Sequence, residues 1–101
     1  MLDRNLYTGL IRLHALHHAA EGPIFGQAMI DELGRHGYRL SAGTLYPILH
    51  GMERQGYLQS KGMSHRGRNR RVYRSTPAGR KALVTARKRV KELFGEMFEH
   101  G

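Results

Sequence analysis

The sequence predicts a mainly α-helical domain that carries one small β-hairpin. Apolar residues recur at steps of three and four in four segments, which is the repeat of a helix with one buried face. Two short segments between the third and fourth of these are strand-like and flank a polar, glycine-containing stretch. The chain has 101 residues, which is enough for one domain and too few for two ordinary ones. The predicted order is therefore helix, helix, helix, hairpin, helix.

The first helix is predicted over residues 5–20, and Glu-Gly-Pro at 21–23 ends it because proline disfavours helix in the residue before it. Its apolar face consists of Leu6, Leu10, Leu13 and Leu16 or His17. The second helix is predicted over residues 24–36, with Gly37 as a left-handed cap. Its expected buried stripe is Phe25, Ala28, Met29 and Leu33. Residues 38–40 could form a short isolated strand.

The third helix is predicted over residues 42–54. Ser41 is a good N-cap, because its hydroxyl can accept a hydrogen bond from a free N–H of the first turn, and Gly56 ends the helix. The side chains expected to face the core are Leu45, Ile48, Leu49 and Met52. The opposite face presents Thr44, Pro47, His50 and Arg54, with Tyr46 at one edge.

The hairpin is predicted from strands at 57–62 and 70–76, joined by a long flexible tip at 63–69. In the second strand, Val72 and the apolar part of Arg74 are expected on a covered face, alternating with Arg71 and Tyr73 on the other.

The last helix is predicted to begin with Thr76 as N-cap and Pro77 as its first residue, and to continue to about residue 99. Its apolar residues alternate at steps of three and four, as in a short coiled-coil seam. They are Leu83, Ala86, Val90, Leu93 or Phe94, and Met97.

The charge of the chain is strongly positive and unevenly placed. Seventeen Lys and Arg face eight Asp and Glu, which gives a formal net charge of +9. Residues 55–91 contain no acid, and such a block of one sign attracts a polyanion. The alternative is a solvated basic face with no partner, but solvated faces normally mix both signs.

Several classes are excluded or disfavoured. The absence of cysteine rules out disulfides and thiol catalysis and removes the usual ligands of structural zinc sites. Neither a catalytic arrangement nor a phosphate-loop glycine spacing stands out, so the chain is not expected to be an enzyme or to hold a cofactor. No apolar run approaches the ~20 residues that span a bilayer, and the first residues lack a signal-peptide pattern. No membrane partner and a cytoplasmic location are therefore expected.

Three helices followed by a hairpin with a basic tip form the chain order of a winged helix-turn-helix. In this fold the third helix enters the major groove of DNA, and the hairpin, called the wing, reaches the backbone or the minor groove. The DNA-binding domain would span residues 1–76, with the recognition helix at about 42–54 and the wing at about 57–76, and a dimerisation helix would follow at 77–101. Small residues in the first turns of a recognition helix let it approach the bases closely, and its free N–H groups suit a phosphate. The residues expected to contact DNA are Ser41, Gly43, Thr44, Tyr46, Pro47, His50, Arg66, Arg68, Arg70 and Arg71.

"SAGTLYPILHGMERQGYL" and "GRNRRVYRSTPAGRKAL" resemble the PadR family of bacterial transcriptional regulators, and "EGPIFGQAMIDEL" is similar to the start of that family's second helix. The resemblance runs from about residue 6 to 83. It implies a dimer of winged helices on a two-fold, palindromic operator, usually as a repressor, in the short form with a single C-terminal dimerisation helix. Many members release DNA when a small aromatic or drug-like effector binds near the dimer interface.

The chain departs from the family pattern at a few places. Phe25-Gly26 replaces the usual Tyr-Gly, and no tryptophan is present to form the ligand-stacking wall of drug-binding relatives. The first helix carries His14, His17 and His18 where apolar residues are expected. His14 and His18 share a helical face, which leaves open whether the histidines sense a metal or pH or are ordinary surface or partly buried residues. No metal site is predicted, because two histidines without a nearby carboxylate or thiol make a weak ligand set.

The homodimer interface is expected on the first and last helices, at Leu6, Leu10, Leu83, Val90, Leu93, Phe94, Met97 and Phe98. The same residues of the last helix could instead form an intramolecular core stripe, or Phe94, Met97 and Phe98 could line an effector pocket. Two other functions stay open: a non-specific nucleic-acid-binding module, including one for RNA, and a protein-interaction module that uses the basic face and the last helix.

Overall fold

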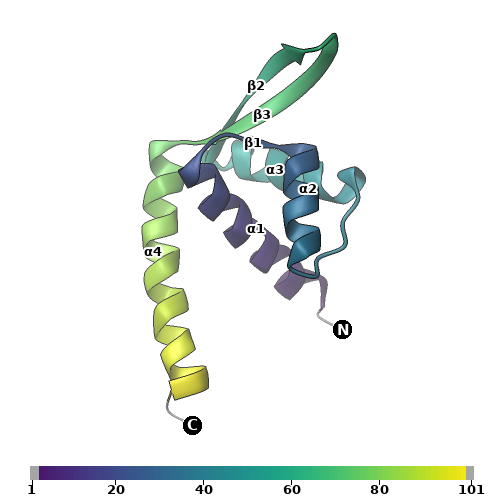
Figure 1. Cartoon of the computed structure of the whole chain (residues 1–101). Helices are drawn as coiled ribbons and strands as arrows, with labels where there is room; N and C mark the ends of the chain where they lie inside the picture. Colours follow the sequence, from purple (N-terminus) through teal and green to yellow (C-terminus); the bar gives the residue numbers. More distant parts are fainter. Residues whose placement is uncertain (1–2, 100–101) are drawn as a thin grey trace.

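The computed structural model describes residues 3–99 and shows the predicted order with one added strand (Figure 1). The elements are α1 (Arg4–Glu21), β1 (Ile24–Phe25), α2 (Gly26–Arg35), α3 (Ala42–Arg54), β2 (Leu58–His65), β3 (Arg68–Ser75), α4 (Pro77–Phe94) and a π-helical turn, η1 (Gly95–Glu99). Helices α1, α2 and α3 pack together, the β2–β3 hairpin extends above them, and α4 runs down and away (Figure 1). The described chain is elongated, with a longest dimension of 54 Å.

Helix α1 begins at an aspartate cap and buries a different face from the predicted one. The carboxylate of Asp3 accepts hydrogen bonds from the N–H groups of Asn5 at 2.9 Å and Leu6 at 3.1 Å. The buried side chains of α1 are Ile11, Ala15, Leu16 and Ala19. The predicted stripe was right at Leu16, which is buried, and wrong at Leu6 and Leu10, which are exposed. Two alanines on the buried face let the neighbouring helices approach more closely than the leucine stripe would.

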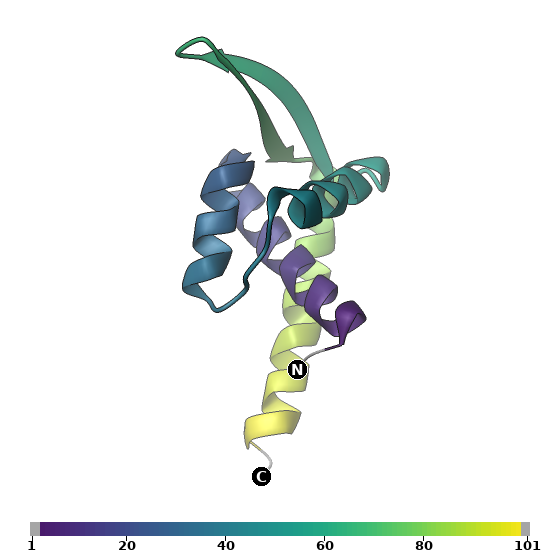
Figure 2. The same cartoon turned by 90° about the vertical axis from the view of Figure 1, so that its right-hand side faces the viewer.

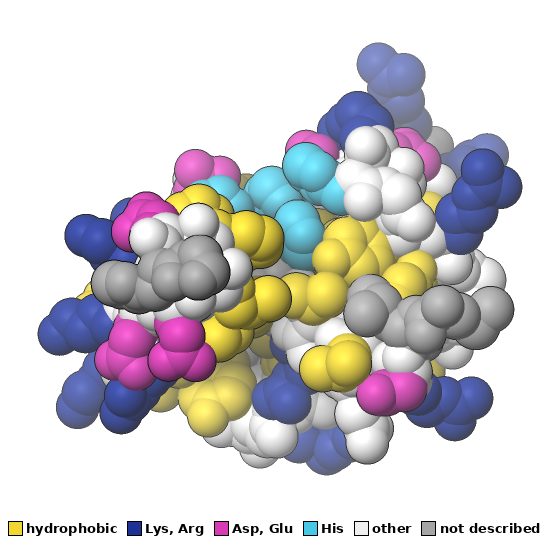
Figure 3. Space-filling model, turned by 90° about the horizontal axis from the view of Figure 1, so that it is seen from below, with side chains coloured by type: hydrophobic (Ala, Val, Ile, Leu, Met, Phe, Trp, Pro, Cys, Tyr) yellow, Lys and Arg dark blue, Asp and Glu magenta, His cyan; other side chains and the backbone are white. Residues whose placement is uncertain are grey.

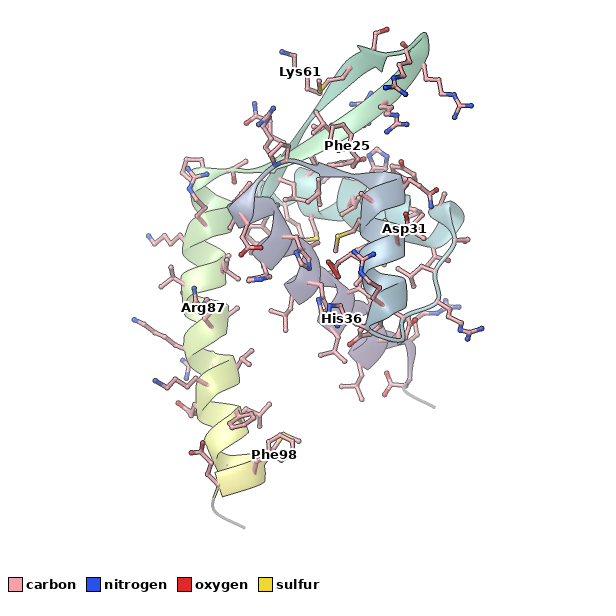
Figure 4. The ribbon with its side chains drawn as sticks, in the orientation of Figure 1. Phe25, Asp31, His36, Lys61, Arg87 and Phe98 are labelled. Carbon is pink, nitrogen blue, oxygen red and sulfur yellow. The ribbon has the colours of Figure 1, made fainter. Side chains whose placement is uncertain are left out.

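Residues 24 and 25 form a strand and not the start of the second helix, which corrects the prediction. Ile24 pairs with Tyr73 and Phe25 pairs with Val72, so that β1 lies antiparallel on the outer edge of β3 in a three-stranded sheet of order β1-β3-β2. Phe25 lies at the foot of the hairpin (Figure 4). This pairing joins positions about fifty residues apart, which no local pattern reveals.

Helix α2 ends at a left-handed glycine, as predicted. Gly37 has φ +89°, and the N–H of Tyr38 donates to the carbonyl of Leu33 at 2.9 Å, which closes the last turn. Met29 and Leu33 are buried as expected, but Ala28 is exposed and Phe25 is only half-buried. Residues 38–40 form no strand.

Helix α3 has the predicted bounds. Leu45, Leu49 and Met52 are buried and Ile48 packs against them at the edge of the core. Ser41 occupies the N-cap position with an extended backbone, but its hydroxyl caps no backbone N–H; it lies 3.4 Å from the hydroxyl of Thr44. The predicted position of the cap is confirmed and its predicted hydrogen bond is not.

The wing is longer and its turn is tighter than predicted. All eight residues of β2 pair with β3, from Leu58 opposite Ser75 to His65 opposite Arg68, and only Arg66 and Gly67 connect them. Both connecting residues have positive φ, 52° and 74°, as two-residue hairpin turns require. The long flexible tip was therefore a wrong prediction, because strand pairing continues through polar residues that carry no strand signal.

Helix α4 begins as predicted, since the hydroxyl of Thr76 accepts a hydrogen bond from the N–H of Gly79 at 2.9 Å and Pro77 is the first helical residue. Leu83 packs against the core, whereas most of the helix projects beyond it. Residues 100 and 101, which belong to the predicted dimerisation region 77–101, lie outside the described residues.

Candidate nucleic-acid interface

The first two turns of α3 present an open, bare surface. Ser41, Gly43, Thr44, Pro47 and His50 are all exposed. A methyl group built on Gly43 would meet only the hydroxyl oxygen of Ser41 at 3.6 Å, an ordinary contact distance. Packing among the described residues therefore does not require glycine at position 43. The surface at Gly43 is open to solvent.

The Tyr46 side chain packs against the start of helix α2. Its ring lies on the backbone of Gly26, the first residue of α2, and a methyl group at Gly26 would fall 2.0 Å from the tyrosine oxygen and 2.4 Å from ring carbon Cζ. Tyr46 is half-buried as a result. Tyr46 is among the residues predicted to contact DNA, and its ring also packs on the backbone of Gly26.

Gly26→Ala is expected to destabilise the fold by about 1–3 kcal/mol, the usual cost of forcing an extra methyl group into a packed contact. Chemical denaturation of both proteins measures this directly. Gly34→Ala is the matched control, because a methyl group at Gly34 would meet nothing within 4 Å. Equal stability of the Gly26 and Gly34 variants would show that the Tyr46 ring moves aside freely.

Glu53 joins α3 to the wing, a role that the sequence did not predict. Its carboxylate accepts hydrogen bonds from Ser60 of β2, from the N–H at 3.0 Å and from the hydroxyl at 2.8 and 2.9 Å. The guanidinium of Arg71 donates to the same hydroxyl at 3.0 Å. This chain of contacts holds the wing against the end of α3. A signal was present, since Glu53 is the single acid between Glu32 and Glu92.

The hydrogen bond from the Ser60 hydroxyl, aided by the Ser60 N–H and the nearby His50 and Arg71, lowers the pKa of Glu53 from its ordinary value of 4.5. A lowered pKa means that the ionised carboxylate stabilises the fold above pH 4.5, and that this contribution disappears as the pH falls through the folded-state pKa. We therefore expect Glu53→Gln to be less stable than the natural chain at pH 7. The difference in unfolding free energy should shrink below pH 4.5. A difference that does not change with pH would contradict this assignment.

The pairing of the strands divides the arginines between the two faces of the wing. Residues directly opposite in an antiparallel pair share a face, and faces alternate along each strand. Arg71, opposite Gly62, lies on the face that also carries Ser60 and Tyr73. Arg68 and Arg70 lie on the other face with Lys61, and Arg66 stands in the turn. All four arginines are exposed, but they do not form the single cluster that the sequence suggested.

Tyr73 is fully buried, which corrects its predicted place on an open face. Strand β1 on one side and the helices below cover it. Its hydroxyl lies 3.5 Å from Nε2 of His50, so the exposed His50 stands over the junction of α3 and the wing. Burial raises the pKa of the Tyr73 hydroxyl, which is therefore neutral at ordinary pH.

The start of helix α3 and the wing lie on the same side of the molecule. The wing tip and the start of α3 are both on the right in Figure 1, with α4 on the left. The wing curves so that its tip stands above α2 (Figure 2). The bare turns of α3 and the basic wing therefore face outward together, away from the last helix.

A second exposed surface lies between α1 and α4. Large apolar side chains there remain between 38 % (Leu10) and 66 % (Phe98) exposed. They border a groove of about 900 Å³ whose apolar walls include Leu10, Leu13, Leu83, Ala86, Val90 and Phe94. Figure 3 shows hydrophobic side chains on both sides of this hollow, and Figure 4 shows Phe98 at the far end of α4. Of the predicted interface residues, Leu6, Leu10, Val90, Leu93, Phe94, Met97 and Phe98 are exposed and Leu83 is half-buried.

His17 and His18 have an acidic neighbour, contrary to the prediction that no carboxylate lies near the histidines of α1. Glu21 lies 3.6 Å from His17 and 3.9 Å from His18. The ring of His14 stacks on that of His18, with ring centres 6.0 Å apart, and also contacts the ring of His36 at the end of α2, with ring centres 5.1 Å apart.

No helix of the described chain is long and apolar enough to cross a membrane.

A winged helix with a bare third helix and a basic hairpin is the architecture of a DNA-binding regulator. The pattern of the transcriptional regulator PadR-like family matches residues 15–85, and the chain belongs to this family. The chain is 50% identical over 94 residues to the transcriptional regulator Rv3488 of Mycobacterium tuberculosis (strain ATCC 25618 / H37Rv), covering 93% of this chain and 88% of that protein.

Solved structures show the same fold. A PadR family transcriptional regulator from Eggerthella lenta DSM 2243 superimposes with a TM-score of 0.80 at 28% identity, over 94% of this chain and 84% of that one. The PadR-like regulator BC4206 from Bacillus cereus strain ATCC 14579 gives a TM-score of 0.72 at 21% identity, over 92% and 88% of the two chains. The chain is therefore a transcriptional regulator of the PadR family and not an enzyme, and this membership implies that it binds DNA.

Proposed function

We propose that this regulator binds a specific two-fold DNA operator as a homodimer and represses transcription in the cytoplasm. The observation that carries the proposal is the bare start of α3 beside a wing tied to the same helix. Gly43 leaves space that the fold does not use, and Glu53 fixes the wing through Ser60. A helix that must enter a major groove about 12 Å wide needs both features.

In this proposal helix α3 and the wing contact different parts of the DNA. The small first turn of α3, with Ser41, Gly43, Thr44 and Pro47, approaches the base edges and the nearest phosphates. The open N–H groups and the positive end of the helix dipole favour a phosphate there. Arg71 extends this surface onto the wing, and His50 stands between the two. Arg66, Arg68 and Arg70 reach phosphates or the minor groove from the outer part of the wing.

The homodimer covers the exposed apolar side chains of α1 and α4 that flank the groove between these helices. A second copy of the chain supplies an equal apolar surface, and a two-fold axis lets each copy cover the other. Since α4 lies away from α3 and the wing, dimerisation through α4 leaves both recognition surfaces free (Figure 1). Two such surfaces would meet half-sites about 34 Å apart, one turn of DNA.

A small aromatic effector that releases the DNA would enter the groove of about 900 Å³ beside the dimer seam. Phe94 and Leu83 line this groove from α4, and Leu10 and Leu13 line it from α1. A flat apolar ligand that changes the angle between α1 and α4 would change the spacing of the two recognition helices.

The direct test is fluorescence anisotropy with the duplex upstream of the protein's own gene and an unrelated duplex, each titrated at several salt concentrations. Tighter binding of the first duplex by about 10³ or more at physiological salt supports the proposal. Equal binding with a steep salt dependence would favour a non-specific nucleic-acid-binding module. No binding to either duplex would favour a protein-interaction module.

Arg68→Ala together with Arg70→Ala is expected to weaken binding to every duplex and to reduce the salt slope by about 0.9 for each lost phosphate contact. Plots of log affinity against log salt concentration give the slope. Lys81→Ala together with Arg89→Ala is the matched control, because it removes the same charge from exposed positions of α4. Equal slopes for the two double variants would mean that the outer wing contributes only net charge.

A further inference from the structure

The C-terminal end of α1 brings together three side chains whose chemistry the DNA interface does not use. His17, His18 and Glu21 each offer one ligand atom, and these atoms lie within 4.8 Å of one another. His17 and Glu21 are one helical turn apart, so the backbone of α1 fixes their separation. The view from below shows the histidines gathered on this face beside acidic side chains (Figure 3).

The separations of these ligand atoms are longer than a hydrogen bond and close to those of two ligands on one metal ion. An oxygen of Glu21 lies 3.6 Å from Nε2 of His17 and 3.9 Å from Nδ1 of His18. Both separations exceed the ~3.2 Å limit of an N–H···O hydrogen bond. Two ligands about 2.1 Å from a tetrahedral ion are about 3.4 Å apart, so a small rotation of the side chains would place an ion between them.

The three side chains are held to different degrees. His18 is the anchored member, with 22 % of its side chain exposed, and its Nε2 is buried without a hydrogen-bond partner among the described residues. Its Nδ1 is therefore the nitrogen that faces outward toward Glu21. The side chains of His17 and Glu21 are 53 % and 66 % exposed, so an ion can reach them from solvent.

We propose that His17, His18 and Glu21 bind one divalent transition-metal ion of borderline softness, such as Zn²⁺, Co²⁺ or Ni²⁺. Two imidazoles and one carboxylate form a ligand set that these ions favour, whereas Mg²⁺ and Ca²⁺ prefer oxygen ligands alone. Three protein ligands leave one position of a tetrahedral ion open to water. The proposal concerns ion binding and does not depend on the proposed operator.

The proposed metal site lies next to the apolar groove and close in sequence to the strand that pairs with the wing. His17 and Glu21 also line the apolar groove between α1 and α4. Gly22 and Pro23 then lead directly into β1, which pairs with β3 of the wing. An ion that fixes the end of α1 would therefore act on the edge of the groove and on the foot of the wing.

Isothermal titration calorimetry of the full chain without a polyhistidine tag, with Zn²⁺ and separately with Co²⁺, tests the site. We expect one ion per chain, and a visible absorption band of Co²⁺ with nitrogen and oxygen ligands. Glu21→Gln and His17→Asn should each weaken binding at least about 10-fold, since even outer-shell partners of metal ligands cost that much. Both positions are exposed, so neither change should unfold the chain, and circular dichroism checks this.

His36→Asn is the matched control, because it removes a histidine of the same surface that lies outside the proposed ligand set. Retained affinity in this variant, with losses at His17 and Glu21, supports the assignment. An equal loss in all three variants would mean a diffuse histidine patch and would overturn it. The absence of any bound ion, with Co²⁺ showing only its spectrum in water, would also overturn it.

Discussion

Leu93→Arg is expected to convert the proposed dimer into monomers and to weaken binding to the proposed operator by about 10²- to 10⁴-fold, the gain that linking two binding modules usually provides. Leu93 is 53 % exposed on the apolar stripe of α4, so a charge there leaves the isolated fold intact. In a dimer the same charge would be buried against the apolar surface of the partner without a counter-ion. Sedimentation velocity gives the mass, and anisotropy gives the affinity.

Thr85→Arg provides the control for this experiment. Thr85 is exposed on α4 but points away from the stripe that contains Leu83, Val90 and Leu93, given the 100° step between helical residues. The Thr85→Arg substitution adds the same charge to the same helix and should leave the oligomeric state unchanged. A monodisperse dimer of the Leu93 variant would place the interface elsewhere, and dissociation of both variants would point to net charge alone.

Gly43→Leu is expected to lower operator affinity about 10- to 100-fold, as much as one or two mismatched base pairs at about 1–3 kcal/mol each. The added side chain would hold the start of α3 away from the base edges. The fold itself should tolerate the change, because a methyl group at Gly43 meets only the Ser41 hydroxyl at contact distance. Operator affinity should therefore fall while the free energy of unfolding stays nearly unchanged.

A pair of alanine variants sharpens this second prediction. Gly43→Ala and Gly51→Ala both place alanine inside α3, where it is favoured over glycine by roughly 0.5–1 kcal/mol. Both should be as stable as the natural chain or more so, since a methyl group at Gly51 meets only the end of Arg54 at 3.8 Å. Only the Gly43 variant should lose preference for the operator. Unchanged specificity in all the Gly43 variants would remove the start of α3 from the DNA interface.

The strongest sequence predictions concern elements whose signals are local. The bounds of α3 follow from Ser41, Gly56 and an apolar repeat within thirteen residues. The start of α4 follows from Thr76 and Pro77, and the end of α2 from Gly37, for the same reason. The short motifs around Gly43 and Arg71 were enough to identify the family, which the comparison with known proteins confirms.

The errors lie where residues far apart in the chain meet. β1 exists because Ile24 and Phe25 find the free edge of β3, and that edge also buries Tyr73. Helix α1 buries Ile11, Ala15, Leu16 and Ala19 and leaves Leu6 and Leu10 exposed, because its face toward the core is set by the helices and strands packed against it.

The amino-acid sequence by itself determined the order of the elements, the bounds of α3, the excess of positive charge and the apolar stripe of α4. These depend on repeats, caps and composition, which any short window of the chain contains. The tertiary structure alone decided which face of α1 is buried, how the wing divides its arginines and how Glu53 holds the wing to α3. Each of these depends on side-chain directions and distances that exist only once the chain has folded.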